Sequence, residues 1–352
     1  MTPRAAAPRP APDLDAAHDP GPENAAARAA RALAAIPSDL IGAPIPWGRN
    51  GSQEIRVGTA SWTDPTMTRS GVFYPRGVSG AEDRLRYYAS QFPVVEVDSS
   101  YYSLPERSTA RLWADRTPNG FLFFAKAHAL MTGQPTEVAR LPEGLARLLP
   151  KELAEKSRVY AKDLPLELQG AVWDHFIDAL GPLISADKLG GLLLQYPRWF
   201  LPTPENKHQI AQSAERVQGI PTGVEFRNRI WYESEKATKW TLDMLRDLSL
   251  THVIVDGPQG LASSVPAVPA VTTPTLSMVR LHGRRAATWE AAKIPTVERY
   301  RYLYSPQELT GIVDKVAEAA SEAELTVVLA NNCYSNYGAT TARELTARLA
   351  LH

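Results

Sequence analysis

Eight short apolar runs, each closed by charged or amide residues, constrain the fold of this chain more than any other feature. The runs are Ile55–Thr59, Val94–Val97, Phe121–Ala125, Leu192–Leu194, Thr222–Val224, Val253–Val255, Leu276–Val279 and Thr326–Ala330. Continuous apolar stretches of this length are typical of parallel strands that are buried on both faces. Because polar residues gather at the same end of each run, those ends are predicted to meet. In a parallel barrel they meet at the mouth, where catalytic residues lie.

Helical patterns alternate with these runs. Apolar residues recur at helical spacing in Ala81–Phe92, directly after the first run. The same character is found in Ser108–Arg116, Leu168–Leu180, Pro204–Val217, Glu235–Asp247, Pro306–Ala320 and Ala339–Leu351. After the sixth run a Pro-rich loop, Gly257–Pro274, replaces the helix. We therefore expect an α/β protein with one (β/α)8 TIM-type barrel, built from right-handed crossovers. A doubly wound open sheet is the competing topology, which periodicity alone does not exclude.

The chain of 352 residues divides into a barrel domain over residues 50–352 and an Ala/Pro-rich segment over residues 1–40. The composition of that segment predicts a disordered tail. A transit peptide is disfavoured because the segment carries acidic residues, Asp13, Asp15, Asp19 and Glu23 among them. Residues 129–189 form an unusually long connection with helical character at Glu143–Leu149 and Lys151–Tyr160. Long connections often act as lids, but the role of this one stays open.

Charge and cysteine content exclude several classes of protein. Lys and Arg number 38, as do Asp and Glu, so no overall field favours nucleic acid or an anionic membrane, although a local basic groove is compatible with this balance. Cys333 is the only cysteine, which excludes an intrachain disulfide and a multi-cysteine zinc site. No apolar stretch has the length of a membrane span or a signal core. We expect a cytoplasmic protein without a membrane partner, and its oligomeric state stays open.

Several motifs along the ordered part resemble one family. They are VGTASW (57–62), FYP (73–75), VEVDSSYYSLP (95–105), FLFFAKAH (121–128), LLLQYP (192–197), VEFRNRIW (224–231), VDGP (255–258), VRLHGR (279–284) and NNC (331–333). In this order they resemble the YecE-like proteins, known as domain of unknown function family 72. The resemblance implies a TIM-type barrel. A remote similarity of that family to endonuclease IV and sugar isomerase barrels implies nucleic-acid or sugar-phosphate chemistry by analogy.

Four residues at the strand ends are candidate catalytic groups: Glu96, Glu225, Lys126 and His282. Residues two apart on a strand share a face, so Glu96 and Asp98 are expected to point into the mouth together, as are Glu225 and Arg227. Such carboxylates can act as acid and base, while Lys126 stabilises a developing oxyanion and His282 transfers protons near neutral pH. The structural alternative is that each carboxylate pairs with Lys or Arg and only stabilises the barrel.

Further strand-end residues are candidate substrate-binding groups. Arginines suit phosphate or carboxylate groups, and aromatic rings suit sugars or bases. The candidates are Trp62, Asp98, Tyr101, His128, Gln195, Arg227, Asp256, Arg280, Arg284, Asn331 and Asn332. No metal ligand is assigned and no cofactor is expected, because the His and carboxylate residues lack a metal-binding spacing. A divalent metal stays open as an alternative.

These observations favour an enzyme, a hydrolase or an isomerase, that acts on a phosphorylated sugar or a nucleic-acid-like anionic substrate at the barrel mouth. The expected partner is thus a small anionic or sugar-like ligand, with nucleic acid as an alternative. Three other hypotheses stay open: a non-catalytic module that binds nucleic acid or an anionic ligand, a metal-dependent phosphodiesterase similar to endonuclease IV, and a barrel whose charged mouth is only structural.

Overall fold

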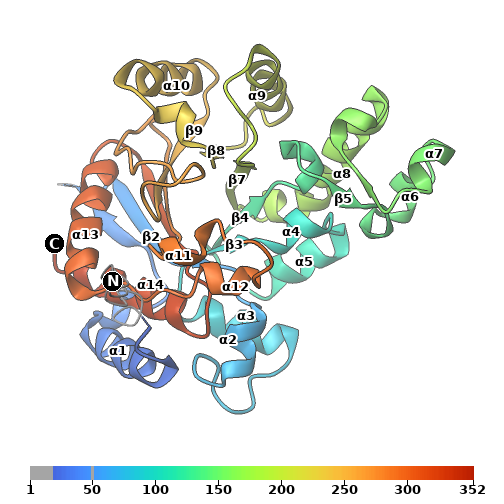
Figure 1. Cartoon of the computed structure of the whole chain (residues 1–352). Helices are drawn as coiled ribbons and strands as arrows, with labels where there is room; N and C mark the ends of the chain where they lie inside the picture. The colour runs from blue at the N-terminus through green and yellow to red at the C-terminus, as the bar shows by residue number, and fades with distance from the viewer. Residues whose placement is uncertain (1–18, 49–50) are drawn as a thin grey trace, which may run out of the picture.

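A closed barrel of parallel strands forms the centre of the computed structural model, which describes residues 19–48 and 51–352 (Figure 1). The barrel strands are β2 (Gln53–Ala60), β3 (Val94–Val97), β4 (Leu122–Lys126), β7 (Leu189–Tyr196), β8 (Thr222–Phe226), β9 (Thr251–Asp256), β10 (Leu276–Leu281) and β11 (Leu325–Ala330). Strand β2 pairs in parallel with both β11 and β3, which closes the sheet. The predicted barrel is therefore confirmed, and the open sheet is excluded.

Each of the eight predicted runs lies in one strand of this barrel, with a single residue, Phe121, outside. Several strands extend past the apolar run because the polar residues at its end continue the backbone ladder. Gln195 on β7 is paired in register with Glu225 on β8, and Leu281 on β10 with Asp256 on β9. The register thus brings the polar ends of neighbouring strands side by side.

Helices surround the barrel. The predicted ones occur in the expected order, and two short helices that the sequence pattern does not predict, Pro65–Ser70 and Ser99–Tyr102, are present as well. Together they are α2 (Pro65–Ser70), α3 (Ala81–Ala89), α4 (Ser99–Tyr102), α5 (Arg107–Asp115), α8 (Leu166–Ser185), α9 (Pro204–Arg216), α10 (Glu235–Asp247), α13 (Pro306–Ala320) and α14 (Tyr337–Leu349). Helix α13 begins with a capping box, in which the Ser305 and Glu308 side chains each accept a hydrogen bond from the other's backbone N–H. Leu309, Ile312 and Val316 lie on its buried face, as an amphipathic helix against a barrel requires.

Two connections carry additional elements. Between β4 and α8 lie helices α6 (Glu143–Ala146) and α7 (Lys151–Ala154), together with the antiparallel pair β5 (Thr136–Glu137) and β6 (Arg158–Val159). This part extends outward beyond α8 (Figure 1). The prediction of helical character over Lys151–Tyr160 is wrong for its second half, because the helix ends at Ala154 and strand β6 follows. Between β10 and α13 lie the short helices α11 (Ala286–Trp289) and α12 (Thr296–Arg299).

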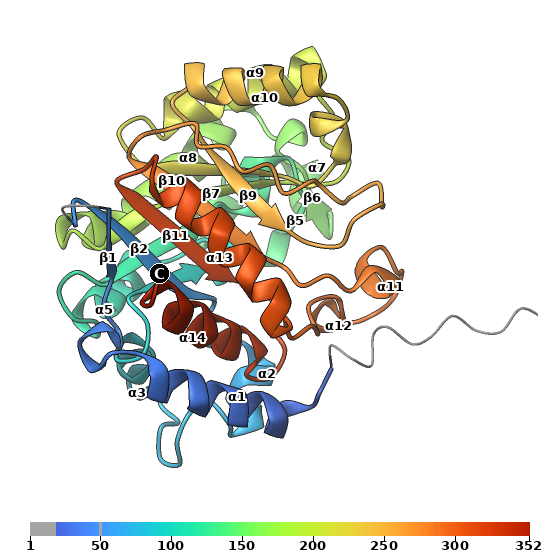
Figure 2. The same ribbon diagram turned by 90° about the vertical axis from the view of Figure 1, so that its left-hand side faces the viewer.

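A helix, α1 (Pro22–Ala35), stands where the composition predicts a disordered tail over residues 1–40. It lies alongside α14 (Figure 2) and buries Ala25 and Ala29. Arg28 fixes this contact, because its Nε donates to Glu344 Oε1 at 2.9 Å. Alanine favours helix and allows close packing, so the prediction of disorder is wrong here. Its part over residues 1–18 lies outside the described residues.

The barrel also pairs with one strand outside it. Strand β1 (Ile45–Trp47) runs antiparallel to the first half of β2 and precedes the barrel domain predicted to begin at residue 50. Within the part of the chain that the structure describes, no helix combines the length and apolar character needed to cross a membrane.

Candidate functional site

Arg280 lies at the centre of the barrel mouth, fully buried on β10. Its Nε and Nη2 donate to the two oxygens of Glu96 on β3 at 2.9 and 2.7 Å. Its Nη1 donates to Glu225 on β8 at 2.5 Å. Burial acts to lower the pKa of Arg280, but the two carboxylates outweigh it and raise that pKa. The guanidinium therefore stays charged and ties opposite strands together.

Glu225 accepts hydrogen bonds from three side chains. Besides Arg280, Arg227 donates through Nε to Glu225 Oε1, and His282 Nε2 lies 3.2 Å from the same oxygen. Burial acts to raise the pKa of Glu225, but the neighbouring cations hold it well below its ordinary value. Complete burial raises the pKa of Glu96, which the Arg280 contact offsets only in part. Every carboxylate oxygen of Glu96 and Glu225 is thus already hydrogen-bonded.

His282 is neutral and fully engaged. Its Nδ1 lies 2.8 Å from Asn331 Nδ2, an amide nitrogen that can only donate, so the ring proton is on Nε2 and faces Glu225. Burial lowers the pKa of His282 to about 3. We name Glu96, Glu225, Arg280 and His282 the floor of the mouth. Its four side chains are completely buried, and their mutual hydrogen bonds favour a positioning role over direct contact with a substrate.

A second ion pair lies beside the floor, and one of its two partners is partly exposed. Lys126 Nζ is 2.8 Å from Asp98 Oδ1 and 4.7 Å from the centre of the Tyr101 ring. The Asp98 side chain is 30% exposed. Burial acts to raise the pKa of Asp98, but Lys126 outweighs it and holds that pKa below its ordinary value. Burial acts to lower the pKa of Lys126, and Asp98 raises it. Both groups are therefore charged at neutral pH.

Gln195 connects the floor with a cavity above it. Its Oε1 accepts from Arg227 Nη2 at 3.2 Å and from Arg280 Nη1 at 3.3 Å. Because guanidinium groups only donate, they fix the orientation of this amide, and its Nε2 points away from them. Gln134, which sequence reasoning missed, donates to the Gln195 carbonyl at 3.1 Å and accepts from Tyr101 OH at 2.8 Å. It comes from the long connection after β4, where no strand-end signal marks it.

The cavity above the floor has a volume of about 360 Å³ and includes Gln134, Gln195 and Arg227 in its lining. We name it the mouth pocket. Its outer lining, here called the rim, comes from the β7–α9 and β10–α13 connections. The rim residues are Arg198, Trp199, Trp289, Glu290, Arg299 and Tyr300. None of these six residues is among the predicted site residues, because they come from connections whose path the strand-end pattern does not determine.

The rim carries two arginines that form no ion pair with any described residue, Arg198 and Arg299. Arg299 donates through Nη2 to the Ala291 carbonyl at 3.0 Å, while its Nε is buried without a hydrogen-bond partner. Glu290 is the only carboxylate among the residues that line the mouth pocket, and its Oε1 accepts from the Ser263 backbone N–H and hydroxyl at 2.8 and 2.7 Å. The mouth pocket therefore has an excess of positive charge.

Asp256 and Arg284, both predicted to bind substrate, form a separate cluster. Arg284 donates to both oxygens of Asp256 at 2.9 and 2.7 Å, and Tyr304 OH donates to the same carboxylate at 2.9 Å. Arg284 Nη1 also contacts Glu308 on α13 at 3.2 Å. These contacts attach the end of β9 to α13, and neither Asp256 nor Arg284 lines the mouth pocket.

Three predicted substrate-binding residues lie away from the floor and the mouth pocket. Trp62 packs edge-on against Trp113, with ring centres 5.7 Å apart. His128 accepts a hydrogen bond from the backbone N–H two residues later, and burial lowers its pKa to about 4. Asn332 donates to the Tyr302 carbonyl at 2.9 Å. Each follows a strand end, but their contacts lie with neighbouring loops and helices.

The donor set at the mouth does not fit a metal ion. In residues 19–48 and 51–352, no group of three or more His, Cys, Asp or Glu side chains could hold one. Glu96, Glu225 and Asp256 are each paired with an arginine, and His282 donates to Glu225. The divalent metal left open by the sequence therefore has no ligand set among the described residues, which disfavours the metal-dependent phosphodiesterase.

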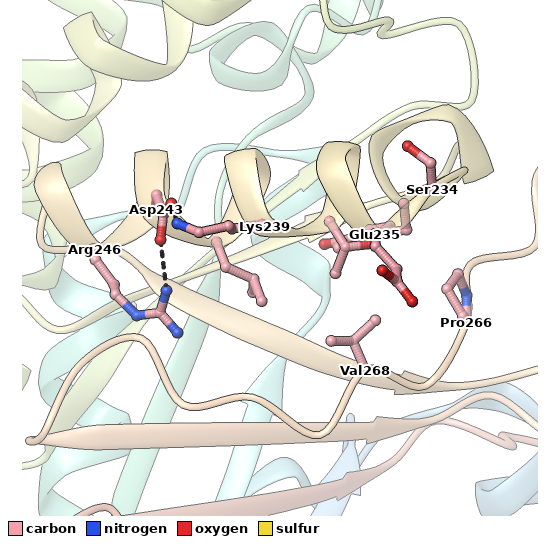
Figure 3. A pocket seen from close by; sticks show the side chains of 10 residues that line it. Ser234, Glu235, Lys239, Asp243, Arg246, Pro266 and Val268 are labelled. Atoms are coloured by element: carbon pink, nitrogen blue, oxygen red, sulfur yellow. Dashed lines mark hydrogen bonds and ion pairs between the residues drawn. The ribbon is translucent and has the colours of Figure 1, made fainter.

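A larger cavity, of about 660 Å³, lies outside the barrel between α10 and the β9–β10 loop (Figure 3). On α10, Asp243 pairs with Lys239 at 2.5 Å and with Arg246 at 2.9 Å, while Pro266 and Val268 lie on the loop side. None of the predicted site residues lines this groove. The mouth pocket is therefore the stronger candidate.

Comparisons with known proteins agree with the barrel. The chain is 28% identical over 281 residues to the UPF0759 protein YunF of Bacillus subtilis strain 168, covering 79% of this chain and 88% of YunF. A DUF72 family protein of Enterococcus faecalis V583 superposes with a TM-score of 0.64 and 26% identity, covering 85% of this chain and 98% of that one. A DUF72 family protein of Thermotoga maritima MSB8 superposes with a TM-score of 0.65 and 27% identity, and the match covers 84% of this chain and 98% of that one.

The family model described as "Protein of unknown function DUF72" matches residues 56–352, from the first barrel strand to the C-terminus. The match covers every motif on which the resemblance depends and leaves α1 outside. The resemblance seen in the sequence is thereby confirmed, and this chain belongs to the DUF72 family.

Proposed function

We propose that this protein is an enzyme that binds a small phosphorylated substrate, of the sugar-phosphate or nucleotide type, in the mouth pocket. The observation that carries the proposal is the charge of the pocket. Arg198 and Arg299 line it, beside Arg227, without forming an ion pair with any described residue. Glu290, whose pKa is lowered by hydrogen bonds from Ser263 and also by Arg198, is the one carboxylate among the described residues that line the pocket. Guanidinium groups bind phosphate oxygens through paired hydrogen bonds.

Asp98 and Lys126 do not themselves line the mouth pocket, but they are the proposed catalytic pair because Asp98 is partly exposed and Tyr101 connects Lys126 to the pocket. Tyr101 lies against Lys126 and donates to Gln134, which lines the pocket. An ionised Asp98 can accept a proton from the substrate, and a charged Lys126 can stabilise the negative charge that follows. Such a step suits hydrolysis or isomerisation. The floor residues position the arginines and Gln195, since they have no exposed polar atom to offer.

Binding of anions provides the first test. In a thermal-shift experiment with inorganic phosphate, sugar phosphates and nucleotides, a ligand at a hundredfold excess over its Kd should stabilise the protein by about 2–3 kcal/mol. Arg198→Ala and Arg299→Ala should each weaken this ligand about tenfold, as expected for the loss of one charge-assisted hydrogen bond. Arg69→Ala is the matched control, because Arg69 is an exposed arginine of α2 outside the pocket. Equal losses in all three variants, or no anion binding, would contradict the proposal.

Turnover of the bound compound provides the second test, with phosphate release and NMR as readouts for hydrolysis and isomerisation. Asp98→Asn keeps the size of the side chain and removes the base, so binding should persist while turnover falls at least a hundredfold. Full turnover in this variant would show that Asp98 is not a catalytic residue. If no ligand found in the screen is turned over by the wild-type chain, the non-catalytic binding module is the better description.

A further inference from the structure

Trp199 differs from the other tryptophan of the mouth pocket. Its side chain is 54% exposed, and it makes no ring contact with any residue that the structure describes. Trp289, in contrast, is buried, with the guanidinium carbon of Arg227 at 5.2 Å and the Tyr300 ring at 5.9 Å from its ring centre. An exposed tryptophan at the edge of a cavity offers a flat aromatic face to a ligand.

The deep end of the pocket has the opposite character. Arg227, with a side chain only 11% exposed, uses Nε on Glu225 and Nη2 on Gln195, which leaves Nη1 without a hydrogen bond to a described residue. Gln195 Nε2 is also without such a partner, because its Oε1 faces the two guanidinium groups. Two hydrogen-bond donors of residues that line the pocket are therefore available to a ligand, and acceptor oxygens are what they require.

Acceptor oxygens at one end of a ligand and a flat ring at the other are the chemistry of a nucleotide. We propose that the mouth pocket binds a nucleoside monophosphate, with its phosphate between Gln195 and Arg227 and the two rim arginines, and its base stacked on Trp199. This inference rests on the proposed function and narrows its substrate class. The cavity of about 360 Å³ is of the size that proteins use for small molecules. Base–aromatic stacking tolerates every base, so recognition of the ring is not expected to select strongly among bases.

The test compares three ligands on the full chain by calorimetry: AMP, ribose 5-phosphate and adenosine. AMP should bind at least about tenfold more tightly than ribose 5-phosphate, since stacking adds that much per base. Trp199→Ala should bring AMP to the affinity of ribose 5-phosphate and leave ribose 5-phosphate unchanged, whereas Trp199→Phe should retain most of the AMP affinity. Trp240→Ala is the control, because Trp240 is 40% exposed on α10, outside the pocket.

The deep end is tested by Gln195→Glu. The new carboxylate can still accept from Arg227 and Arg280, so the fold should persist, but it places an acceptor where the phosphate needs a donor. AMP should bind at least about tenfold more weakly, while adenosine, which has no phosphate, should be unaffected. An unchanged melting temperature in the absence of ligand shows that the loss is local. Unchanged AMP binding would overturn the assigned phosphate position.

Several outcomes would overturn the nucleotide assignment. Equal binding of AMP and ribose 5-phosphate, with Trp199→Ala without effect, would reject the nucleotide, and the proposed function would survive if Arg198→Ala still weakened both. If an oligonucleotide binds more tightly than AMP, the ligand of the pocket is a nucleic-acid strand and not a nucleoside monophosphate. If neither phosphorylated compound bound and the arginine variants changed nothing, the proposed function itself would fail.

Discussion

The floor and the rim of the barrel mouth are both rich in charge, but they differ in how that charge is paired. In the floor, Arg280 is buried between Glu96 and Glu225, and every charged atom has a partner. At the rim, Arg198 and Arg299 line a cavity without forming an ion pair with any described residue. Paired buried charges hold strands in register, whereas unpaired ones are available to a ligand. Charge at a barrel mouth therefore indicates a binding site only after its partners are known.

The sharpest way to break this comparison is Arg280→Met, which leaves Glu96 and Glu225 buried without their common partner. We expect a loss of about 3–5 kcal/mol in the free energy of unfolding, measured in urea. Arg198→Ala, at the rim, should change that free energy by no more than about 0.5 kcal/mol. If the two variants lose similar stability, the distinction between floor and rim is wrong.

A smaller effect is expected where the floor joins the rim loop. Gly283 has a φ of 77°, and an added Cβ would lie 2.5 Å from the Tyr302 Cβ. Gly260 has a similar φ of 85° but open space around it, which makes it a matched control. Gly283→Ala should therefore cost about 1–3 kcal/mol more than Gly260→Ala in the same unfolding assay. Equal costs would mean that the loop adjusts freely, and the floor would not fix the position of the rim.

The smallest change in the free energy of unfolding is expected from acid, through the buried His282 of the floor. His282 has a pKa of about 3 in the folded chain, below the value of about 6.5 in an unfolded chain. The unfolded state therefore takes up the proton first. The stability linked to His282 is present above pH 6.5 and falls by about 1.4 kcal/mol per pH unit as the pH drops toward 3. Urea unfolding at pH 7, 6 and 5 should show a shallower decline in His282→Asn. Parallel declines would show that His282 is accessible to protons when folded.

The fold is predicted well from the sequence because buried parallel strands carry their signal locally. All eight runs became barrel strands, and the polar ends of β7, β8 and β10 met as the barrel topology requires. The composition of the first 40 residues predicts disorder because alanine and proline content says nothing about the surface against which a segment packs. Ala25 and Ala29 are buried against the rest of the protein, a tertiary contact that no local pattern contains.

The candidate site is predicted only in part, for a similar reason. Strand ends fix the floor, so Glu96, Glu225 and Arg280 were found together. The rim comes from loops, where the path of the chain decides which side chains reach the pocket. Trp199 and Arg299 therefore carry no signal in the sequence, while Trp62 follows a strand end and packs against a helix instead. Whether a charge is paired is likewise a property of the folded chain.

The segment before the family match contacts residues that follow the lining of the mouth pocket closely in the chain. Asp19 pairs with Arg301 at 2.6 Å, two residues from Arg299, and Arg28 donates to the Tyr304 carbonyl at 2.6 Å. Trimming the chain to its family boundary at residue 56 would thus remove supports of the pocket while leaving every barrel strand except the first few residues of β2 intact. In such a shortened protein the rim would be held less firmly, and ligand screens would test a less ordered pocket. Helix α1 therefore belongs in any preparation used to search for the substrate.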